Sequence, residues 1–181
     1  MKGSNLKENR ISPGIEICVD YSDDFNEMIK SLGQIIVSDN RIDSKHFPCP
    51  PQYCGKKIKI LAQTFYFGFD MDEKRTNNKI LEFGFRPANL IELLYFQTFN
   101  PRSFGGEILV AGNAIWRDGL SNRFIAGLRP EDTNAVCGSS FNCDFISGEK
   151  QKNKIVSKLF LSNYFHNYQS NWSILGIKRL E

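Results

Sequence analysis

Five cysteines are the side chains of this 181-residue sequence best suited to bind a metal. Four of them form two close pairs, Cys49-x4-Cys54 and Cys137-x5-Cys143. A structural zinc site usually takes two pairs of ligands with about two to four residues inside each pair. The spacings here are slightly long, and two prolines lie inside the first pair. We therefore favour free thiols, with a zinc site as the alternative.

The two histidines, His46 and His166, are candidates for acid–base chemistry. A catalytic base needs a partner that orients it and a nucleophile within reach. No residue at motif spacing supplies either, so ordinary surface or packing roles are favoured for both side chains. The alternative is an enzyme whose residues meet only in the folded chain, for example Asp118, Arg123 and His166.

Two weak patterns could bind phosphate or a divalent metal. The segment 103–106 (Ser-Phe-Gly-Gly) lacks the Lys-Ser/Thr pair that completes a nucleotide-binding loop, and a predicted strand follows it instead of a helix. Asp70, Asp72 and Glu73 precede a predicted helix, where capping and favourable charge at the helix start explain them better than a metal does. The sequence therefore predicts no cofactor.

The segment 163–172 is the strongest candidate for binding a partner. It is rich in Tyr, Asn and Ser, which combine rigid contact area with adaptable hydrogen bonds. It lies between two predicted strands, and loops in such positions often carry function. The alternative is that its aromatic rings fill the core, and Phe165 and Trp172 are expected to pack inward. The candidate binding residues here are Tyr164, His166, Asn167, Tyr168, Gln169 and Trp172.

Composition excludes some classes of protein. The net charge of +3 is too mild for a typical nucleic-acid-binding domain, so nucleic acid is an unlikely partner. No apolar run reaches the ~18–20 residues of a membrane-spanning helix, and the polar start of the chain lacks the apolar centre of a secretory signal. A cytoplasmic protein with no membrane partner is expected. Fifteen Phe residues predict a core built largely from aromatic rings.

Helices are predicted over 24–32, 72–83 and 89–100, and strands over 15–19, 58–69, 108–116, 123–128, 155–161 and 173–177. Within 58–69, Ile58 and Ile60 fall on one face of the predicted strand. The phenylalanines at 65, 67 and 69 fall on the other face. A bulge near 61–62, or burial of both faces, would account for this change. Because the helices come early and the strands late, the chain should be α+β, with short helices on a mostly antiparallel, aromatic-rich sheet and long loops in its C-terminal half. Residues 1–14 are expected to form a flexible leader and 15–181 a single domain.

The segment 84–94 predicts a sharp corner between two helices. Gly84 can stop a helix in the left-handed conformation, and Pro87 forces the residue before it to be extended. Asn89 and Glu92 have the spacing of a capping box for the next helix. Arg86 is the one polar residue of the corner without a structural task, so we add it to the candidate binding residues.

This corner, the segments 47–48, 57–60 and 108–119, and the tail 171–178 (Asn-Trp-Ser-Ile-Leu-Gly-Ile-Lys) resemble a family of small uncharacterised proteins from candidate-phylum bacteria. The resemblance spans about residues 35–179. Phe85 stands where the family usually has Tyr, and Asn113 where it usually has Ser. No activity is attached to this family, so the resemblance implies no catalytic residue. The late strands also resemble C-type-lectin-like domains, which implies a fold alone.

These patterns favour a non-enzymatic binding module that uses its Tyr- and Asn-rich segment to bind an unknown protein or a small polar ligand. The spatially assembled enzyme named above is one alternative. A weak nucleic-acid-associated protein, with affinity that falls steeply as salt rises, is another.

Overall fold

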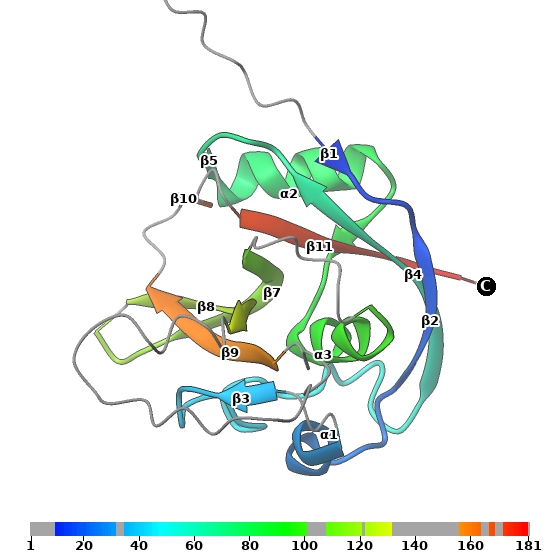
Figure 1. Cartoon of the computed structure of the whole chain (residues 1–181), viewed down its shortest axis with the longest axis vertical. Coiled ribbons are helices and arrows are strands. Elements are labelled where there is room, and N and C mark those ends of the chain that lie inside the picture. The colour runs from blue at the N-terminus through cyan, green and yellow to red at the C-terminus, as the bar shows by residue number, and fades with distance from the viewer. Residues whose placement is uncertain are drawn as a thin grey trace, which may run out of the picture.

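The computed structural model describes residues 10–31, 35–100, 108–120, 122–131, 156–163, 167–168 and 172–180. It is an α+β fold in which a mixed, mostly antiparallel sheet curves around one helix (Figure 1), as the sequence predicts. The sheet contains nine strands: β1 (Arg10–Ile11), β2 (Ile15–Asp20), β3 (Ile35–Val37), β4 (Lys57–Tyr66), β6 (Arg86–Pro87), β7 (Ile108–Arg117), β8 (Arg123–Glu131), β9 (Val156–Asn163) and β11 (Trp172–Arg179).

The strand order is β1-β4-β11-β7-β8-β9-β3, with β2 also paired to β4 and β6 to β11. Two pairs, β11 with β7 and β3 with β9, are parallel. Two short strands, β5 (Met71–Asp72) and β10 (Asn167–Tyr168), form a separate ribbon. β1 falls within the segment expected as a leader, and residues 1–9 lie outside the described residues.

The three predicted helices are present as α1 (Phe25–Ser31), α2 (Glu73–Glu82) and α3 (Leu90–Phe99). Each begins where a polar side chain accepts backbone hydrogens: Asp24, Asp72 and Asn89 accept from the third residue after them. Gly84 has a φ of 77° and ends α2 as predicted. These caps satisfy backbone groups that would otherwise be unpaired at the helix ends.

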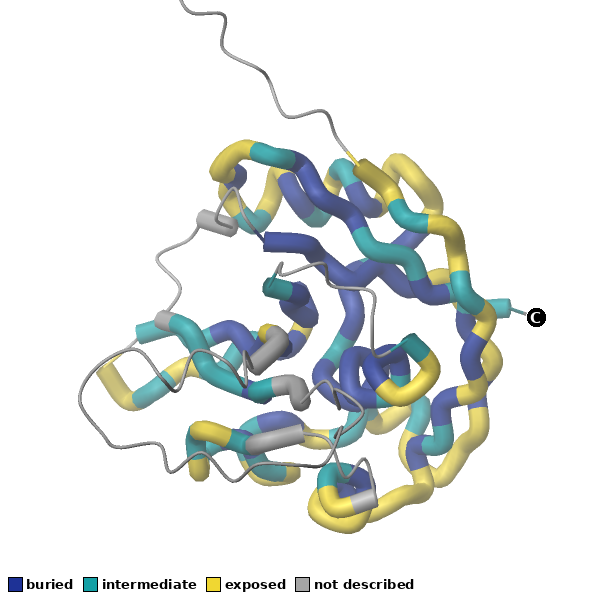
Figure 2. The backbone as a smooth tube through the Cα atoms, in the orientation of Figure 1, coloured by how far each residue is buried: buried dark blue, intermediate teal, exposed yellow. Residues whose placement is uncertain are grey.

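Strand β4 contributes to the core with one face along its first half and with the other face at its end, which explains why its apolar positions change face. Ile58, Ile60 and Ala62 belong to a core cluster with α3, whereas Phe65 and Phe67 belong to a second cluster that includes Ile80 of α2. The pairing of β4 with β11 runs without a register shift from residue 60 to residue 66. Of the two explanations offered above, the bulge is therefore wrong, and the strand has core contacts on both faces. α3 and β11 are buried along most of their length (Figure 2).

The central strand β7 is irregular. The register of β7 with β8 shifts between Val110 and Ile115, around Gly112 and Asn113. The backbone N–H of Asn113 donates to the carbonyl of Ala88, and its side-chain amide donates to the carbonyl of Pro87 at 2.7 Å. The bulge therefore ties the central strand to the corner before α3.

An ion pair at the β2–β4 edge gives a pH-dependent prediction. Lys57 Nζ lies 2.6 Å from Asp20 Oδ2. The hydrogen bonds from Lys57 and then Ser22 lower the pKa of Asp20 from 3.8 to about 2. A carboxyl group with a lowered folded-state pKa stabilises the fold above its unfolded pKa, and this stabilisation is lost as the pH falls through the folded value.

Asp20→Asn should therefore lower the free energy of unfolding above pH 3.8, and its difference from wild type should shrink as the pH falls to about 2. Urea unfolding at several pH values measures this. In a Lys57→Gln background the same substitution should have a much weaker pH dependence. A difference from wild type that is as large at pH 2 as at pH 6 would contradict the assignment.

Candidate functional site

An open cleft of about 560 Å³ lies at the start of α2. Ligand sites usually have volumes of ~300–1,000 Å³, so the cleft is large enough for a small molecule. Its lining is polar and carries both signs of charge. The lining residues are Asp72, Glu73, Lys74, Asn77, Asn78 and Arg123.

Local sequence at the end of β5 fixes the acidic side of this cleft. The carboxylate of Asp72 accepts a hydrogen bond from the Arg75 N–H at 2.8 Å and so caps α2. This confirms the predicted capping role of Asp72. Glu73 follows on the first turn, and its carboxylate pairs with Arg123 Nη2 at 2.5 Å.

Arg123 comes from β8, fifty positions away along the chain from Glu73. Its side chain is only 14% exposed, and that of Glu73 is 29% exposed. The pair therefore joins α2 to the sheet and forms a fixed wall of the cleft, which leaves the exposed Lys74 and Asn78 free to meet a ligand.

Asn77 supplies a specific hydrogen-bonding position. Its Oδ1 atom is buried and has no hydrogen-bond partner among the described residues. Most buried polar atoms in proteins are paired, so each exception asks for an explanation. Because Asn77 lines the cleft, a turn of its side-chain amide toward the cleft would let a ligand N–H or O–H group satisfy this acceptor.

Two residues of the segment 163–172 lie beside this cleft. Asn167 pairs with Asp72, and Tyr168 pairs with Met71, in the β10–β5 ribbon. The side chains of Asn167 and Tyr168, and all of Tyr164, His166 and Gln169, lie outside what the structure describes. Trp172, which begins β11, is 3% exposed and packs in the second core cluster.

Asp118, Arg123 and His166 were the candidates for a spatially assembled enzyme. Asp118 accepts hydrogen bonds from the N–H groups of Leu120 and Asn122 and from the side-chain amide of Asn122. The bond from the Asn122 side chain is the largest cause that lowers the pKa of Asp118. Its carboxylate therefore shapes the β7–β8 turn, whereas Arg123 points to Glu73 and His166 is not described.

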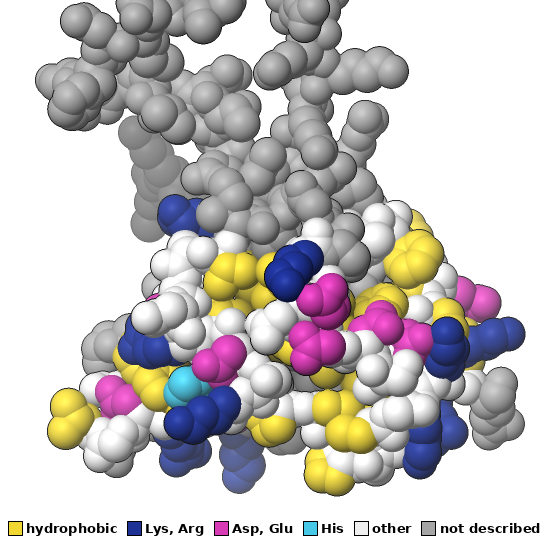
Figure 3. Space-filling view, turned by 90° about the horizontal axis from the view of Figure 1, so that it is seen from below, with side chains coloured by type: hydrophobic (Ala, Val, Ile, Leu, Met, Phe, Trp, Pro, Cys, Tyr) yellow, Lys and Arg dark blue, Asp and Glu magenta, His cyan; other side chains and the backbone are white. Residues whose placement is uncertain are grey.

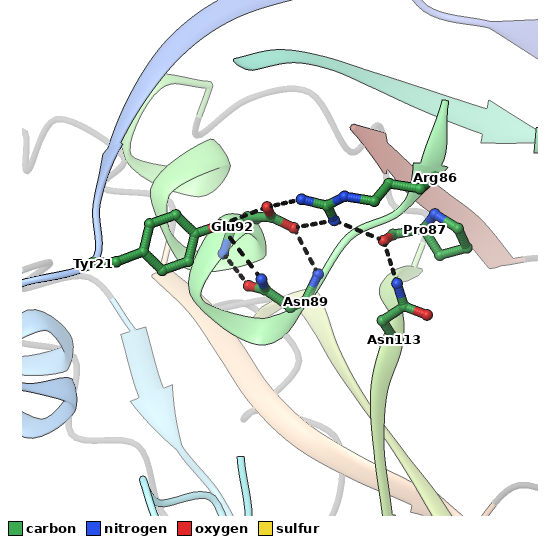
Figure 4. Close-up of polar contacts among 6 residues, drawn as sticks. All are labelled: Tyr21, Arg86, Pro87, Asn89, Glu92 and Asn113. Atoms are coloured by element: carbon green, nitrogen blue, oxygen red, sulfur yellow. Dashed lines mark hydrogen bonds and ion pairs between the residues drawn. The ribbon is translucent and has the colours of Figure 1, made fainter. Parts of the chain in front are cut away.

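Arg86, the last candidate residue, belongs to a buried network at the corner before α3 (Figure 4). Glu92, which is fully buried, accepts four hydrogen bonds: from Tyr21 Oη at 2.6 Å, from Arg86 Nη2 at 2.5 Å, from Arg86 Nη1 at 2.9 Å and from the Asn89 N–H at 2.8 Å. The side chain of Arg86 is 32% exposed.

Electrostatics in this network favour a charged pair beside a neutral phenol. Burial, and then the nearby Glu92 charge, raise the pKa of Tyr21. Burial opposes the charge of Arg86, but the hydrogen bonds and attraction of Glu92 outweigh it and raise the pKa of Arg86. Because both carboxylate oxygens of Glu92 are occupied by protein donors, the network is suited to hold the corner in place.

The structure also contains a cluster of polar and aromatic side chains that the sequence did not predict. Arg41 lies over the rings of Trp116, at 5.1 Å, and Phe124, at 4.6 Å. His46 meets Trp116 edge-on at 5.1 Å and shares a 2.7 Å contact with Asp43. Sequence spacing gives no signal for the contacts with Trp116 and Phe124, because they join residues that are far apart along the chain. Figure 3 shows the lower face, where acidic and basic side chains are interspersed.

The described ranges bear on two further kinds of site, one for a metal ion and one for a membrane. No group of three or more His, Cys, Asp or Glu side chains there is arranged to hold a metal ion. Cys49 and Cys54 are free thiols, and Cys137 and Cys143 lie outside those ranges. None of the described helices combines the length and apolarity needed to cross a bilayer.

Comparison with known proteins gives no relative on which to base a function. No family model, curated protein or solved structure matches the chain. The function is therefore argued from the cleft and its neighbours.

Proposed function

We propose that the protein is a binding module for a small polar ligand, which occupies the cleft at the start of α2. The observation that carries this proposal is the unpartnered, buried Asn77 Oδ1 in the cleft lining. A ligand with hydroxyl or amide groups would donate to this atom once the Asn77 amide turns toward the cleft, and the exposed Lys74 and Asn78 would supply further hydrogen bonds.

The β10–β5 ribbon supports a role for the Tyr- and Asn-rich segment in the same site. It holds Asn167 and Tyr168 against Met71 and Asp72, and Asp72 is part of the cleft lining. Tyrosine and amide side chains are common where sites recognise polar ligands by contact area and adaptable hydrogen bonds. We therefore extend the proposed site from the cleft to this segment.

Asn77→Ala tests the proposal most directly. The binding of a panel of neutral mono- and disaccharides and short uncharged peptides can be followed by saturation-transfer NMR. For any compound bound by wild type, the variant should bind roughly 5- to 10-fold more weakly, because one hydrogen bond is worth ~1 kcal/mol. The melting temperature should stay the same or rise, because the substitution removes a buried acceptor that has no partner among the described residues.

Asn26→Ala is the matched control, because Asn26 is an exposed helical asparagine of α1 outside the cleft lining. It should bind like wild type. Replacing Tyr164, Tyr168 and Gln169 by Ala should also abolish binding with little change in melting temperature. Binding by the Asn77 variant as tight as by wild type, or no binding by wild type across the panel, would overturn the proposal.

A further inference from the structure

Cys49 and Cys54 lie at the two ends of one tight turn. The N–H groups of Tyr53 and Cys54 both donate to the carbonyl of Pro50, at 2.8 and 3.2 Å. Pro50 and Pro51 restrict the backbone at the start of the turn. The turn therefore brings the two cysteines back toward each other over a short, stiff stretch of chain.

The two sulfur atoms lie on the same side of this turn. Cys54 Sγ is 3.5 Å from the carbonyl oxygen of Cys49 and 3.5 Å from that of Pro50. Cys49 Sγ is 3.6 Å from the same Pro50 oxygen. Both sulfurs therefore touch one carbonyl oxygen, and a hydrogen bond between the two thiols places them next to each other.

The environments of the two thiols differ. Cys54 is exposed, whereas Cys49 is half-buried and packs against the first core cluster. Burial, and then the hydrogen bond with Cys54, raise the pKa of Cys49 to about 12. A thiolate is the form that attacks a disulfide, so the exposed cysteine is the one suited to react first.

We propose that Cys49 and Cys54 form a reversible disulfide by exchange with a small disulfide of the glutathione type. The Cys54 thiolate attacks one sulfur of glutathione disulfide, which forms a mixed disulfide and releases one glutathione thiolate. Cys49 then loses its proton to solvent and attacks the Cys54 sulfur, and the second glutathione leaves as a thiolate. The two protein thiols lose two electrons, and glutathione disulfide gains them to become two glutathione thiols.

A disulfide between Cys49 and Cys54 would fix the turn that carries Tyr53. The ring of Tyr53 lies 5.2 Å from that of Tyr21 and 5.7 Å from the guanidinium of Arg86. The oxidised turn would therefore be anchored directly over the buried network before α3. This position separates the thiol pair from the cleft at α2, and the inference does not rest on the proposed function.

The test incubates the reduced full-length chain with glutathione disulfide, alkylates the remaining thiols and maps them by peptide mass spectrometry. Wild type should yield a peptide with a Cys49–Cys54 disulfide. Cys49→Ser should instead accumulate glutathione on Cys54. In Cys54→Ser, Cys49 should take up glutathione at least about tenfold more slowly than Cys54 does in Cys49→Ser, because a raised pKa leaves little thiolate.

Cys18→Ser is the control, because Cys18 is an exposed free cysteine on β2, and it should form the disulfide as wild type does. Circular dichroism checks that each variant is folded. A wild-type chain that stops at the mixed disulfide would overturn the proposal. Joining of Cys49 or Cys54 to a different cysteine would also overturn it.

Discussion

Replacing Glu92 by Gln should lower the free energy of unfolding by about 3 kcal/mol, because removing one partner of a buried ion pair leaves the other uncompensated. The carboxylate is fully buried and holds Arg86, Tyr21 and the backbone of Asn89. Breaking a buried ion pair usually costs ~3–5 kcal/mol. We expect the lower end of this range because the side chain of Arg86 is 32% exposed and water can still solvate it. Urea unfolding followed by circular dichroism measures the change.

Glu27→Gln is the matched control on an exposed helix. Glu27 pairs with Lys30 at 3.0 Å, but its side chain is 71% exposed, so the cost should be below about 0.5 kcal/mol. Arg86→Met combined with Glu92→Gln should be less destabilised than the sum of the two single variants, because the double variant has no unpaired charge. Strict additivity would show that the two side chains do not act as a pair.

Gly176→Ala should lower the free energy of unfolding by about 2–3 kcal/mol, at the upper end of the usual cost of overpacking. A methyl group at this position in β11 would overlap the ring of Phe65 and lie 3.3 Å from Cβ of Phe85. The ring of Phe65 is fully buried and packs against Phe67, Phe83 and Phe85, so it has little room to move. Thermal and urea unfolding both measure the loss.

Gly119→Ala makes the same chemical change where an added Cβ meets nothing within 4 Å. Its effect should stay within about 0.5 kcal/mol of wild type, the usual range for a surface substitution. Combining Gly176→Ala with Phe65→Leu should cost less than the sum of the two single substitutions, because the smaller side chain makes space for the methyl group. A Gly176→Ala variant as stable as wild type would show that β11 and the aromatic cluster can separate easily.

Local signals in the sequence predict most of the regular structure. Asp24, Asp72 and Asn89 mark three helix starts, and Gly84 marks a helix end, because capping depends on residues three or four positions apart. The shortest strands were missed, since a pair of residues carries no periodic pattern.

Contacts between distant segments were not predictable from spacing. The capping role of Glu92 is visible in the sequence, but its bond to Tyr21 joins residues 71 positions apart. The pairing of Glu73 with Arg123 spans 50 positions. Such pairs depend on how the sheet closes around α3, and this depends on the whole core. The role of Arg86 was missed for another reason: its partner Glu92 is only six positions away, but the chain turns a corner between them.

The candidate site was predictable only in part, for the same physical reason. The sequence pointed to the segment 163–172, and the β10–β5 ribbon places two of its residues beside the cleft. The cleft itself is assembled from the start of α2 and from Arg123 on β8, which no local pattern connects. Asn77 carried no signal at all, because an unpaired acceptor can be recognised only once its surroundings are known.

The central place of β11 has a consequence for synthesis on the ribosome. This strand, residues 172–179, lies between β4 and β7 and pairs with both. A nascent chain that has emerged only to β9 therefore cannot join the two parts of its sheet, and unpaired strand edges remain open to other chains. We expect β11 to join the two parts of the sheet only after residue 179 leaves the exit tunnel. A chaperone that shields strand edges would act before that point.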